Sequence, residues 1–477
     1  MKILFAASEA RPFAASGGLA DVVGSLPAAM QAQSDDMDCR VVMPLYQVVT
    51  PEMRNQMTYL TNINVDVSWR KQYCGIYTIT VGKIIYYLLD NPYYFMREGM
   101  YGFDDDCERF VFFCRAVLDL LPIIDWKPDI IQCNDWETAM IPVFYQTLYR
   151  YHQEYEHIRT VFTIHNIQYQ GVYDKSVITE IMGLPTYHTN LLEYDGMVNL
   201  MKGAIETADR VTTVSPTYAQ EILDPWYSYG MDRELVRRSD GIVGILNGID
   251  VDSYNPETDP EVVKPFSPTK LQGKKDCRRA LLSEFDLPDT TAPVIGIVTR
   301  FVAHKGIQLI QQSFQEMINM GCTFVILGSG EQFYEDFFKE MQAEYPQQVH
   351  VTLGFEPALS RRIYAGADIF LMPSQNEPCG LAQMIAMRYG TIPIVRETGG
   401  LKDSVRDAGG ENGNGFTFKN YEASDLLWAV QRASQMFADK RKWNTLIRRA
   451  MRCDYSWHTS AAKYLELYNA VLEQPDR

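Results

Sequence analysis

The sequence lacks the features that would tie it to a membrane, to nucleic acid or to an oxidising compartment. No apolar run approaches the roughly 20 residues that a membrane helix needs. Basic residues are few: 44 Lys and Arg stand against 60 Asp and Glu, and the net charge of −16 argues against binding to nucleic acid or anionic membranes. The nine cysteines include no C-x-x-C pair, so neither a disulfide framework nor a zinc cluster is indicated. We therefore expect a reduced, cytoplasmic protein with no membrane and no nucleic-acid partner.

Several catalytic signatures are absent as well. There is no Walker A sequence, no H-E-x-x-H and no G-x-S-x-G, so hydrolase interpretations lose support. The run 328–333 resembles a dinucleotide fingerprint, but Phe333 occupies the third glycine position, which disfavours an NAD-dependent oxidoreductase. The histidines show no metal-ligand spacing, so no metal is expected.

The chain is long enough for more than one folded domain. Its 477 residues suggest two or three domains at about 150 residues each, and 46% hydrophobic residues supply buried cores. At the N-terminus, the apolar run 2–7 is followed at once by Glu9 and Arg11. This pattern indicates a first buried strand and not a signal peptide.

Short apolar or β-branched runs alternate with helix-length periodic stretches along the whole chain. Helices are expected at 109–121 and 307–320, among others. The alternation predicts an α/β fold with parallel sheets and right-handed crossovers. Between residues 63 and 89, apolar and polar residues alternate instead, which predicts an antiparallel meander. The expected parallel strands lie at 2–7, 129–132, 159–164, 210–214, 293–298, 323–327, 349–353, 368–372 and 392–395.

A domain boundary is expected near residues 241–244. A charged, strand-poor stretch precedes this point, and a new series of strands follows it. We therefore expect one domain over residues 1–243 and a second over residues 244–455.

A short internal repeat supports two related domains. The pattern Ser/Thr-Gly-Gly-Leu-x-Asp-x-Val occurs at 16–23 and again at 398–405, each time after a strand-like run. A Ser or Thr can cap a helix, and glycines let backbone N–H groups approach a ligand. Two such helix openings suggest two doubly wound domains that face one cleft. A single copy would indicate no more than a tight turn between strand and helix.

Residues that directly follow strands are the candidates for chemistry, because ligands of open α/β sheets bind beyond the carboxyl ends of the strands. Arg300 and Lys305 follow an apolar strand, and in so acidic a chain these two cations suit a diphosphate. The alternative is an ordinary surface pair at the start of a helix. His165 at a strand end and Glu377 at a helix start are each compatible with a structural role too.

Taken together, these and further motifs closely resemble the bacterial glycogen synthase and plant starch synthase family over nearly the whole chain. The single motifs are weak signals, but the set in this order is specific. The runs that carry the resemblance are SGGLADVVGSLP (16–27), YGFDDDCERFVFF (101–113), NDWETA (134–139), FTIHNIQYQG (162–171), TTVSPTYAQEI (212–222), GILNGID (244–250), PSQNEPCGLAQMIAMRYGTIPIVRETGGL (373–401) and YSWHTSAAKYLELY (455–468).

The resemblance implies a retaining glucosyltransferase of the GT-B fold, with two Rossmann-like domains facing a deep interdomain cleft. Residues 1–243 would form the acceptor-side domain, residues 244–455 would bind the nucleotide sugar, and residues 456–477 would cross back onto the first domain as a helix. The enzyme would transfer glucose from ADP-glucose to the non-reducing 4-hydroxyl of an α-1,4-glucan such as glycogen, without a metal or another cofactor. A cytoplasmic location is implied, or a plastid for a processed plant protein.

The resemblance also implies roles for individual residues. Arg300 and Lys305 would neutralise the donor diphosphate, and Glu377 would stabilise positive charge at the anomeric carbon. The family is thought to use a front-face displacement, in which the leaving phosphate accepts the acceptor's proton. His165 would line the glucose pocket and Asp135 would lie on the acceptor side. The remaining donor or substrate contacts are expected from Gly18, Asp21, Asn247, Cys379, Gly380, Leu381 and Gly400, and from Phe355, which would stack on the base.

Four positions depart from the family pattern. Ala15 stands where the family usually has Lys before the first Gly-Gly, so a cation near the donor is missing. Gln375, Ala382 and Glu137 replace a common Arg, a usual Thr and a frequent His or Gln. Two alternatives therefore stay open: the same transfer from UDP-glucose, and an inactive glycan-binding relative.

Overall fold

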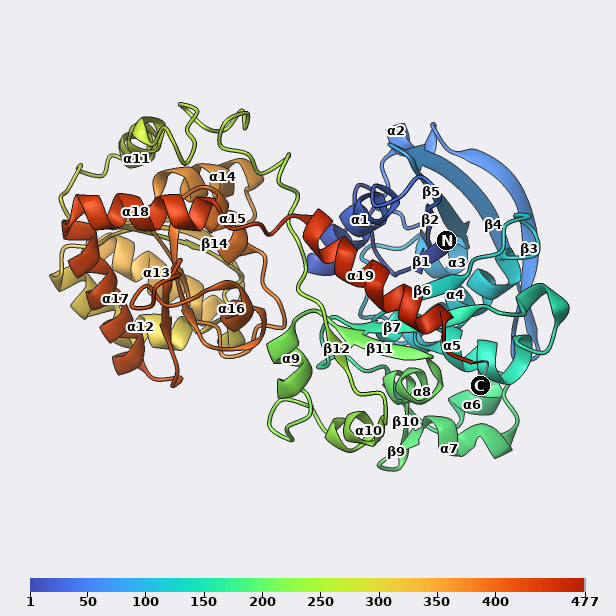
Figure 1. The fold of residues 1–477 in the computed structure, drawn as a ribbon. Coiled ribbons are helices and arrows are strands. Elements are labelled where there is room, and N and C mark those ends of the chain that lie inside the picture. Colours follow the sequence, from blue (N-terminus) through green and yellow to red (C-terminus); the bar gives the residue numbers. More distant parts are fainter. Residues whose placement is uncertain (476–477) are drawn as a thin grey trace. The chain divides into compact units, whose positions relative to one another are not determined.

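The computed structural model describes residues 1–475 and divides into two compact units. One unit comprises residues 1–248 together with the C-terminal segment from Trp457 onward, and the other comprises Ile249–Ser456. Each unit is built around its own β-sheet (Figure 1).

The first unit contains a nine-stranded sheet in the order β12-β11-β7-β6-β1-β2-β5-β4-β3. The strands from β12 to β5 run parallel, whereas β3, β4 and β5 pair antiparallel. The predicted meander is thus present, and β5 joins it to the parallel sheet by pairing with β2. The bounds are β1 (Lys2–Ala6), β2 (Asp38–Pro44), β3 (Thr58–Val67), β4 (Arg70–Val81), β5 (Ile84–Asp90), β6 (Ile130–Asn134), β7 (Arg159–Ile164), β11 (Arg210–Thr213) and β12 (Val243–Gly244).

The helices of the first unit bury apolar side chains against this sheet. The largest are α1 (Gly18–Gln31), α4 (Asp106–Leu120), α8 (Leu200–Thr207) and α19 (Trp457–Leu472), and α4 is buried on almost every side. The smaller elements are α2 (Pro51–Arg54), α3 (Pro92–Phe95), α5 (Met140–Phe144), α6 (Val177–Glu180), α7 (Thr189–Leu192), α9 (Pro216–Glu221), α10 (Asp232–Arg237) and the sheet of β8 (Val172–Tyr173), β10 (Met197–Asn199) and β9 (Glu193–Tyr194).

Helix α19 is far from the first unit in sequence but packs within it, against α1 (Figure 1). The fully buried Tyr468 hydroxyl donates a hydrogen bond of 2.9 Å to Oε1 of Gln132 in β6, and Ser460 Oγ donates one of 2.7 Å to the Leu246 carbonyl. The boundary that we expected at 243/244 falls inside β12, which pairs with β11. The first unit therefore ends at Gly248.

The second unit has a six-stranded, all-parallel sheet in the order β15-β14-β13-β16-β17-β18. Its strands are β13 (Val294–Val298), β14 (Thr323–Gly328), β15 (Val349–Leu353), β16 (Ile369–Met372), β17 (Ile392–Arg396) and β18 (Phe416–Phe418). Its helices are α11 (Gln272–Glu284), α12 (Ile307–Asn319), α13 (Gln332–Glu344), α14 (Pro357–Gly366), α15 (Ala382–Arg388), α16 (Gly399–Ser404), α17 (Ala423–Ala438) and α18 (Lys440–Met451). The helices expected at 109–121 and 307–320 correspond to α4 and α12.

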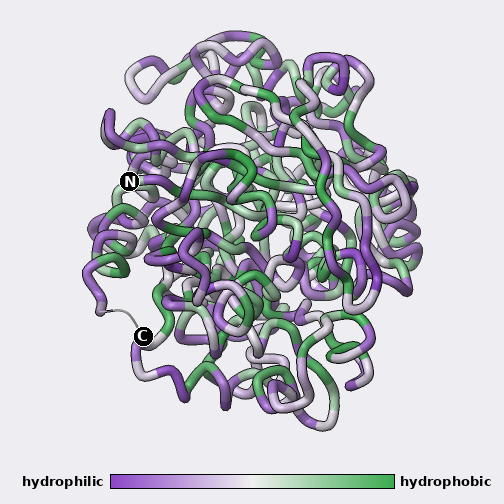
Figure 2. Tube along the Cα trace, turned by 90° about the vertical axis from the view of Figure 1, so that its right-hand side faces the viewer, coloured by the Kyte–Doolittle hydropathy of each residue, from purple (hydrophilic) through white to green (hydrophobic). Residues whose placement is uncertain are grey.

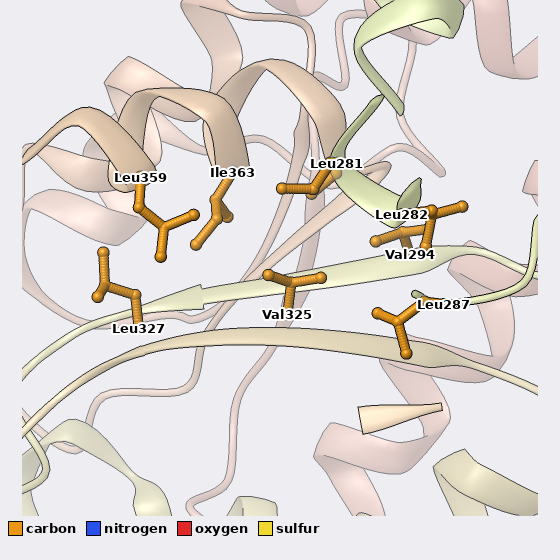
Figure 3. Packing of buried hydrophobic residues seen from close by; sticks show 9 residues of the cluster. Leu281, Leu282, Leu287, Val294, Val325, Leu327, Leu359 and Ile363 are labelled. Carbon is orange, nitrogen blue, oxygen red and sulfur yellow. The ribbon is translucent and has the colours of Figure 1, made fainter. Parts of the chain in front are cut away.

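One part of the second core shows why the strands are so apolar. Leu281 of α11 and Ile363 of α14 lie over Val325 in the middle of β14 (Figure 3). A Cβ at Gly366 would meet Leu281 Cβ at 2.8 Å, so glycine lets α14 approach α11 closely. Strands covered by helices need apolar side chains on both faces, as the sequence pattern indicated.

Each sheet has one point where the strand order reverses. In the first unit this point lies between β1 and β6, and in the second between β13 and β16. Such switch points leave a crevice beyond the carboxyl ends of the two strands, and ligands of doubly wound folds bind there. The segments after β1, β6, β13 and β16 are therefore the places to look for a site.

Hydrophobic and hydrophilic segments are interspersed along the trace (Figure 2). Within the described residues, no helix is both long enough and apolar enough to cross a membrane.

We expect Tyr468→Phe to lower the free energy of unfolding by about 1–3 kcal/mol, because Oε1 of Gln132 would lose its buried donor. Urea unfolding followed by circular dichroism measures this change. Tyr151→Phe, at a tyrosine that is 80% exposed, is the matched control and should unfold like wild type. Equal midpoints for Tyr468→Phe and wild type would contradict the importance of this contact.

Candidate functional site

In the second unit, the strongest feature is an ion pair beyond the carboxyl ends of β13 and β16. Lys305 Nζ lies 2.6 Å from Oε2 of Glu377, and the two side chains are only 16% and 9% exposed. The Ser374 hydroxyl donates a second hydrogen bond, of 3.1 Å, to the same carboxylate oxygen. The structure thus brings together two of the residues predicted as catalytic, at the switch point of this sheet.

A glycine fixes the position of Lys305. Gly306 has φ of 77°, in the left-handed region, and a Cβ there would stand 2.1 Å from the carbonyl oxygen of Pro373. Any other residue would push the turn after β13 away from the segment that carries Glu377. The glycine therefore permits the close approach that the ion pair needs.

Arg300 is exposed, and no carboxylate pairs with its guanidinium among residues 1–475. The nearby imidazole of His304 has its pKa lowered, first by burial and then by the charge of Lys305. Because His304 is neutral, the cations after β13 are Arg300 and Lys305. Of these two, only Lys305 has an anionic partner among the described residues. An arginine with unused donors suits a phosphate. Phe355, after β15, is 84% exposed and presents an open aromatic face.

The second Gly-Gly opening packs directly on the segment after Glu377. A Cβ at Gly399 would meet the Glu377 carbonyl oxygen at 2.0 Å, and one at Gly400 would meet that of Cys379 at 2.2 Å. The Gly400 N–H donates to the carbonyls of Glu377 and Pro378, at 3.2 and 3.0 Å. We expected this N–H to face a ligand, but in this structure it is engaged within the protein. Gly400 acts here through packing.

Of two polar residues beside Glu377, Asn376 lies in the run after a strand where candidates were expected, and Gln383 was missed by the sequence reasoning. Asn376 Oδ1 and Gln383 Oε1 are buried and accept no hydrogen bond from any described residue. Gln383 Nε2 donates to the carbonyls of Cys379 and Gly380, at 3.2 and 2.9 Å, and so supports this loop. Gly380 has φ of 71°, and Leu381 precedes the first residue of α15. Unpartnered buried acceptors next to Glu377 suit the hydroxyl groups of a sugar.

In the first unit, Asp135 and His165 are brought together at the ends of β6 and β7. Asp135 Oδ1 accepts the backbone N–H groups of His165 and Asn166, at 2.7 and 3.3 Å. Asp135 has φ of 57°, which is rare outside glycine and holds its side chain across the strand ends. Burial raises the pKa of Asp135 to about 7, although its two backbone hydrogen bonds oppose the shift.

His165 is a neutral imidazole at physiological pH, because burial lowers its pKa to about 3. Its Nε2 lies 2.9 Å from Oδ1 of Asn134, whose Nδ2 donates to the Ala6 carbonyl. This arrangement assigns the proton to Nε2 and leaves Nδ1 as a hydrogen-bond acceptor.

Two further carboxylates gather near Asp135, and the sequence reasoning did not select either as a site residue. Glu137 is 7% exposed, and its Oε2 accepts no hydrogen bond from any described residue. Burial, followed by the charge of Asp135, raises the pKa of Glu137 well above its usual range. Glu9, after β1, has its pKa raised by burial and accepts the Ser16 N–H at 2.5 Å.

The first Gly-Gly opening is open to solvent. A Cβ at Gly18 would meet nothing within 4 Å, so glycine is not required there by packing within the chain. Asp21 forms an exposed ion pair with Arg11 at 2.5 Å and so already has a cationic partner. Asn247 is 6% exposed, and its Oδ1 accepts no hydrogen bond from any described residue.

Among residues 1–475, no three His, Cys, Asp or Glu side chains gather closely enough to hold a metal ion.

We expect Asp135→Asn to stabilise the protein above pH 8, by about 1–4 kcal/mol. The folded protein binds the Asp135 proton more tightly than the unfolded chain, since the pKa rises from 3.8 to about 7. The associated stability is present below pH 4 and is lost as the pH rises through 7, and asparagine removes that loss. Thermal unfolding of Asp135→Asn and of wild type at pH 4 and pH 8 measures the difference in stability between the two proteins. This difference should be smaller at pH 4 than at pH 8.

Asp105→Asn is the control for that experiment, because the pKa of Asp105 is lowered and its substitution should change stability in the opposite direction. Arg97 binds Asp105 through two contacts of 2.6 and 2.7 Å and lowers the pKa of its carboxyl. This variant should be less stable than wild type at pH 8. If the stability of Asp135→Asn and that of wild type change with pH in the same way, the pKa of Asp135 is not raised to about 7.

Comparison with known proteins assigns the chain to a family. The family model of the starch synthase catalytic domain matches residues 2–237, and that of glycosyl transferases group 1 matches residues 281–448. Glycogen synthase of Alkaliphilus metalliredigens is 45% identical over 99% of this chain and 100% of its own length. Glycogen synthase of Geobacillus stearothermophilus is 45% identical over 100% of this chain and 99% of its own length.

Solved structures agree with this assignment. The catalytic domain of starch synthase IV from Arabidopsis thaliana, bound to ADP and acarbose, superposes with a TM-score of 0.90 at 36% identity and 99% coverage of both chains. Sucrose-phosphate synthase from Thermosynechococcus elongatus shares the fold, with a TM-score of 0.62 at 17% identity and 98% coverage of both chains. The family predicted from the motifs and the GT-B fold class are confirmed: this chain belongs to the bacterial glycogen synthase and plant starch synthase family of glycosyltransferases.

Proposed function

We propose that the protein transfers glucose from ADP-glucose to the non-reducing 4-hydroxyl of an α-1,4-glucan, with retention of configuration. The observation that carries the proposal is the buried contact of Lys305 with Glu377 at the switch point of the second sheet, beside the unpaired Arg300. The related starch synthase IV was solved with ADP and acarbose, which supports a nucleotide-sugar donor and a glucan acceptor. A cytoplasmic location accords with the bacterial relatives and with nine free thiols.

The second unit is proposed to hold the donor. Arg300 supplies unused donors to the diphosphate, while Lys305 bridges between the phosphate and Glu377. These two cations provide the positive charge that stabilises a departing diphosphate, so our proposal assigns no metal or other cofactor to this role. The exposed Phe355 would stack on the base. The sugar hydroxyls would be held by the loop that Cys379, Gly380 and Leu381 form after Glu377.

Glu377 is proposed to face the anomeric carbon as a carboxylate. The bond between this carbon and the diphosphate oxygen lengthens first, positive charge develops on the sugar, and Glu377 stabilises that charge. The acceptor hydroxyl then attacks from the same face and gives its proton to the leaving phosphate oxygen. Pre-positioned groups supply most of the rate enhancement in such a reaction.

The first unit is proposed to supply neutral and weakly acidic groups. His165 is uncharged and offers Nδ1 as an acceptor to a glucose hydroxyl, and the unpartnered Oδ1 of Asn247 does the same. Asp135 is assigned to the acceptor side. Gly18 and Asp21 are assigned to contacts with donor or substrate at the open start of α1.

We expect Glu377→Ala to lower the rate of glucose transfer to glycogen roughly a hundredfold or more, because the developing charge loses its partner. The assay uses ADP-glucose and UDP-glucose in parallel, with EDTA present. Glu340→Ala, at an exposed glutamate of α13, is the matched control and should keep the wild-type rate.

Three outcomes would contradict parts of the proposal. Transfer only from UDP-glucose would overturn the donor assignment and leave the fold and reaction intact. Glycogen binding without transfer from either donor would favour an inactive glycan-binding relative. A glucosyl adduct trapped on Asp135 or Glu377 would replace the front-face displacement by a covalent route.

The missing family lysine offers a separate test. Ala15 is exposed at the opening of α1, so a lysine fits there without repacking. If the absent charge weakens donor binding, Ala15→Lys should lower the KM for ADP-glucose several-fold with little change in kcat. Ala15→Gln, which adds length without charge, is the control. An unchanged KM would show that this position does not contribute to donor affinity.

A further inference from the structure

The second unit contains an arginine-lined cavity that the glucosyl-transfer reaction does not use. It is open to solvent, since four of its seven lining residues are exposed, and its volume is about 590 Å³. None of its lining residues contributes to the ion pair or the glycine-rich loops described above. The lining comes from the end of α18 and from the loop after α16: Arg406, Asn412, Thr445, Arg448, Arg449, Arg452 and Cys453.

The four arginines have no carboxylate partner in the part of the chain that the structure describes. Arg406 Nε donates to the Asn412 carbonyl at 3.1 Å, and Arg449 Nη1 donates to that of Gly413 at 2.9 Å. Arg448 donates to the carbonyls of Pro268 and Asn444, at 3.2 and 3.4 Å. Neutral carbonyls orient these guanidinium groups but leave their charges uncompensated.

A nearby carboxylate is already committed elsewhere. Asp407, next to Arg406, forms two contacts of 2.8 and 2.9 Å with Arg432, which lies outside the cavity. These contacts help to lower the pKa of Asp407, so it stays ionised and paired with Arg432. The four positive charges around this cavity repel one another. They form a local positive region in a chain whose net charge is −16. An anionic ligand would relieve this repulsion.

The C-terminal dipole of α18 explains only part of this arrangement. Cations in a last helical turn are stabilised by the dipole, and this accounts for Arg448 and Arg449. It does not account for Arg406, which comes from another segment, or for Arg452, which follows the helix. Convergence from separate segments on one cavity is typical of a ligand site.

From this convergence we propose that the cavity at the end of α18 binds the phosphate group of a small phosphorylated molecule. Guanidinium groups match phosphate oxygens in bidentate geometry, and several arginines together suit a dianion. The volume exceeds what a single phosphate ion fills, so the favoured ligand is a phosphate ester with an organic part, such as a hexose monophosphate.

Isothermal titration calorimetry at fixed ionic strength tests the proposal, with glucose 1-phosphate, inorganic phosphate and glucose as probes. Because the exposed Arg300 also attracts phosphate, the titration is made on Arg300→Gln, which leaves the buried pair of Lys305 with Glu377 intact. Glucose 1-phosphate should still bind this protein saturably, and glucose should not. Tighter binding of glucose 1-phosphate than of phosphate identifies an ester site, whereas equal binding reduces the site to one for free phosphate and overturns the ester assignment.

Adding Arg448→Gln and Arg449→Gln to that variant should weaken binding at least tenfold, since charged hydrogen bonds are lost. Arg452→Gln covers the case in which this variant unfolds, because the exposed Arg452 side chain forms no hydrogen bond or ion pair with the described residues. Arg441→Gln, at an exposed position of the same helix outside the cavity, is the control and should bind like its parent. Binding that is absent, or that survives Arg452→Gln and the Arg448/Arg449 substitutions, would overturn the proposal.

Discussion

The buried ion pair between Lys305 and Glu377 is the constraint on which the local structure of the second unit depends. Both charges leave water, so each needs the other, and removing one partner would strand the remaining charge. The Ser374 hydroxyl supports the carboxylate. The glycines on either side follow from this requirement: Gly306 lets the lysine turn touch Pro373, and Gly399 lets α16 touch the Glu377 backbone.

The switch points of the two units carry side chains of opposite charge type: cations in the second unit and carboxyl groups in the first. The second unit gathers cations, one of them unpaired, and so favours an anion. The first unit instead gathers the buried Glu9 and Glu137 and the half-buried Asp135, whose pKa values are all raised by loss of solvation. Carboxyl groups held in this way cost stability when they ionise, and a fold tolerates such a cost at functional sites. The difference in charge is therefore a property of the two switch points, each within its own unit.

Periodicity in the sequence was sufficient to predict most of the fold. The runs that became β7 and β15 were bounded correctly, although only β7 is buried at every position and β15 is a partly exposed edge strand. The alternating pattern predicted the β3–β5 meander because alternate residues of β3 are exposed and the strand pairs antiparallel with β4. The domain boundary expected at 243/244 lies a few residues too early. The two-residue strand β12 belongs to the first unit because it pairs with β11, and the sequence alone did not reveal that pairing.

The site was predictable only in part. The positions of Arg300 and Glu377 after apolar strands marked them, but the contact of Lys305 with Glu377 joins segments far apart in the chain. Glu137 gave no signal beyond its departure from the family pattern, because burial of a carboxylate depends on tertiary packing. Gly400 was assigned to a ligand because a helix opening looks alike in sequence whether its N–H is open or bonded to a neighbouring loop.

The return of α19 to the first unit has a consequence for the order in which the protein is made. The second unit is continuous from Ile249 to Ser456, so the ribosome completes it before any of α19 has been synthesised. Until then the side of α1 that α19 covers, and the buried Gln132 that Tyr468 satisfies, lack their partners. Domains usually fold in order from the N-terminus during synthesis. In this chain the unit that begins first is finished last, because it lacks α19 until the second unit has been made.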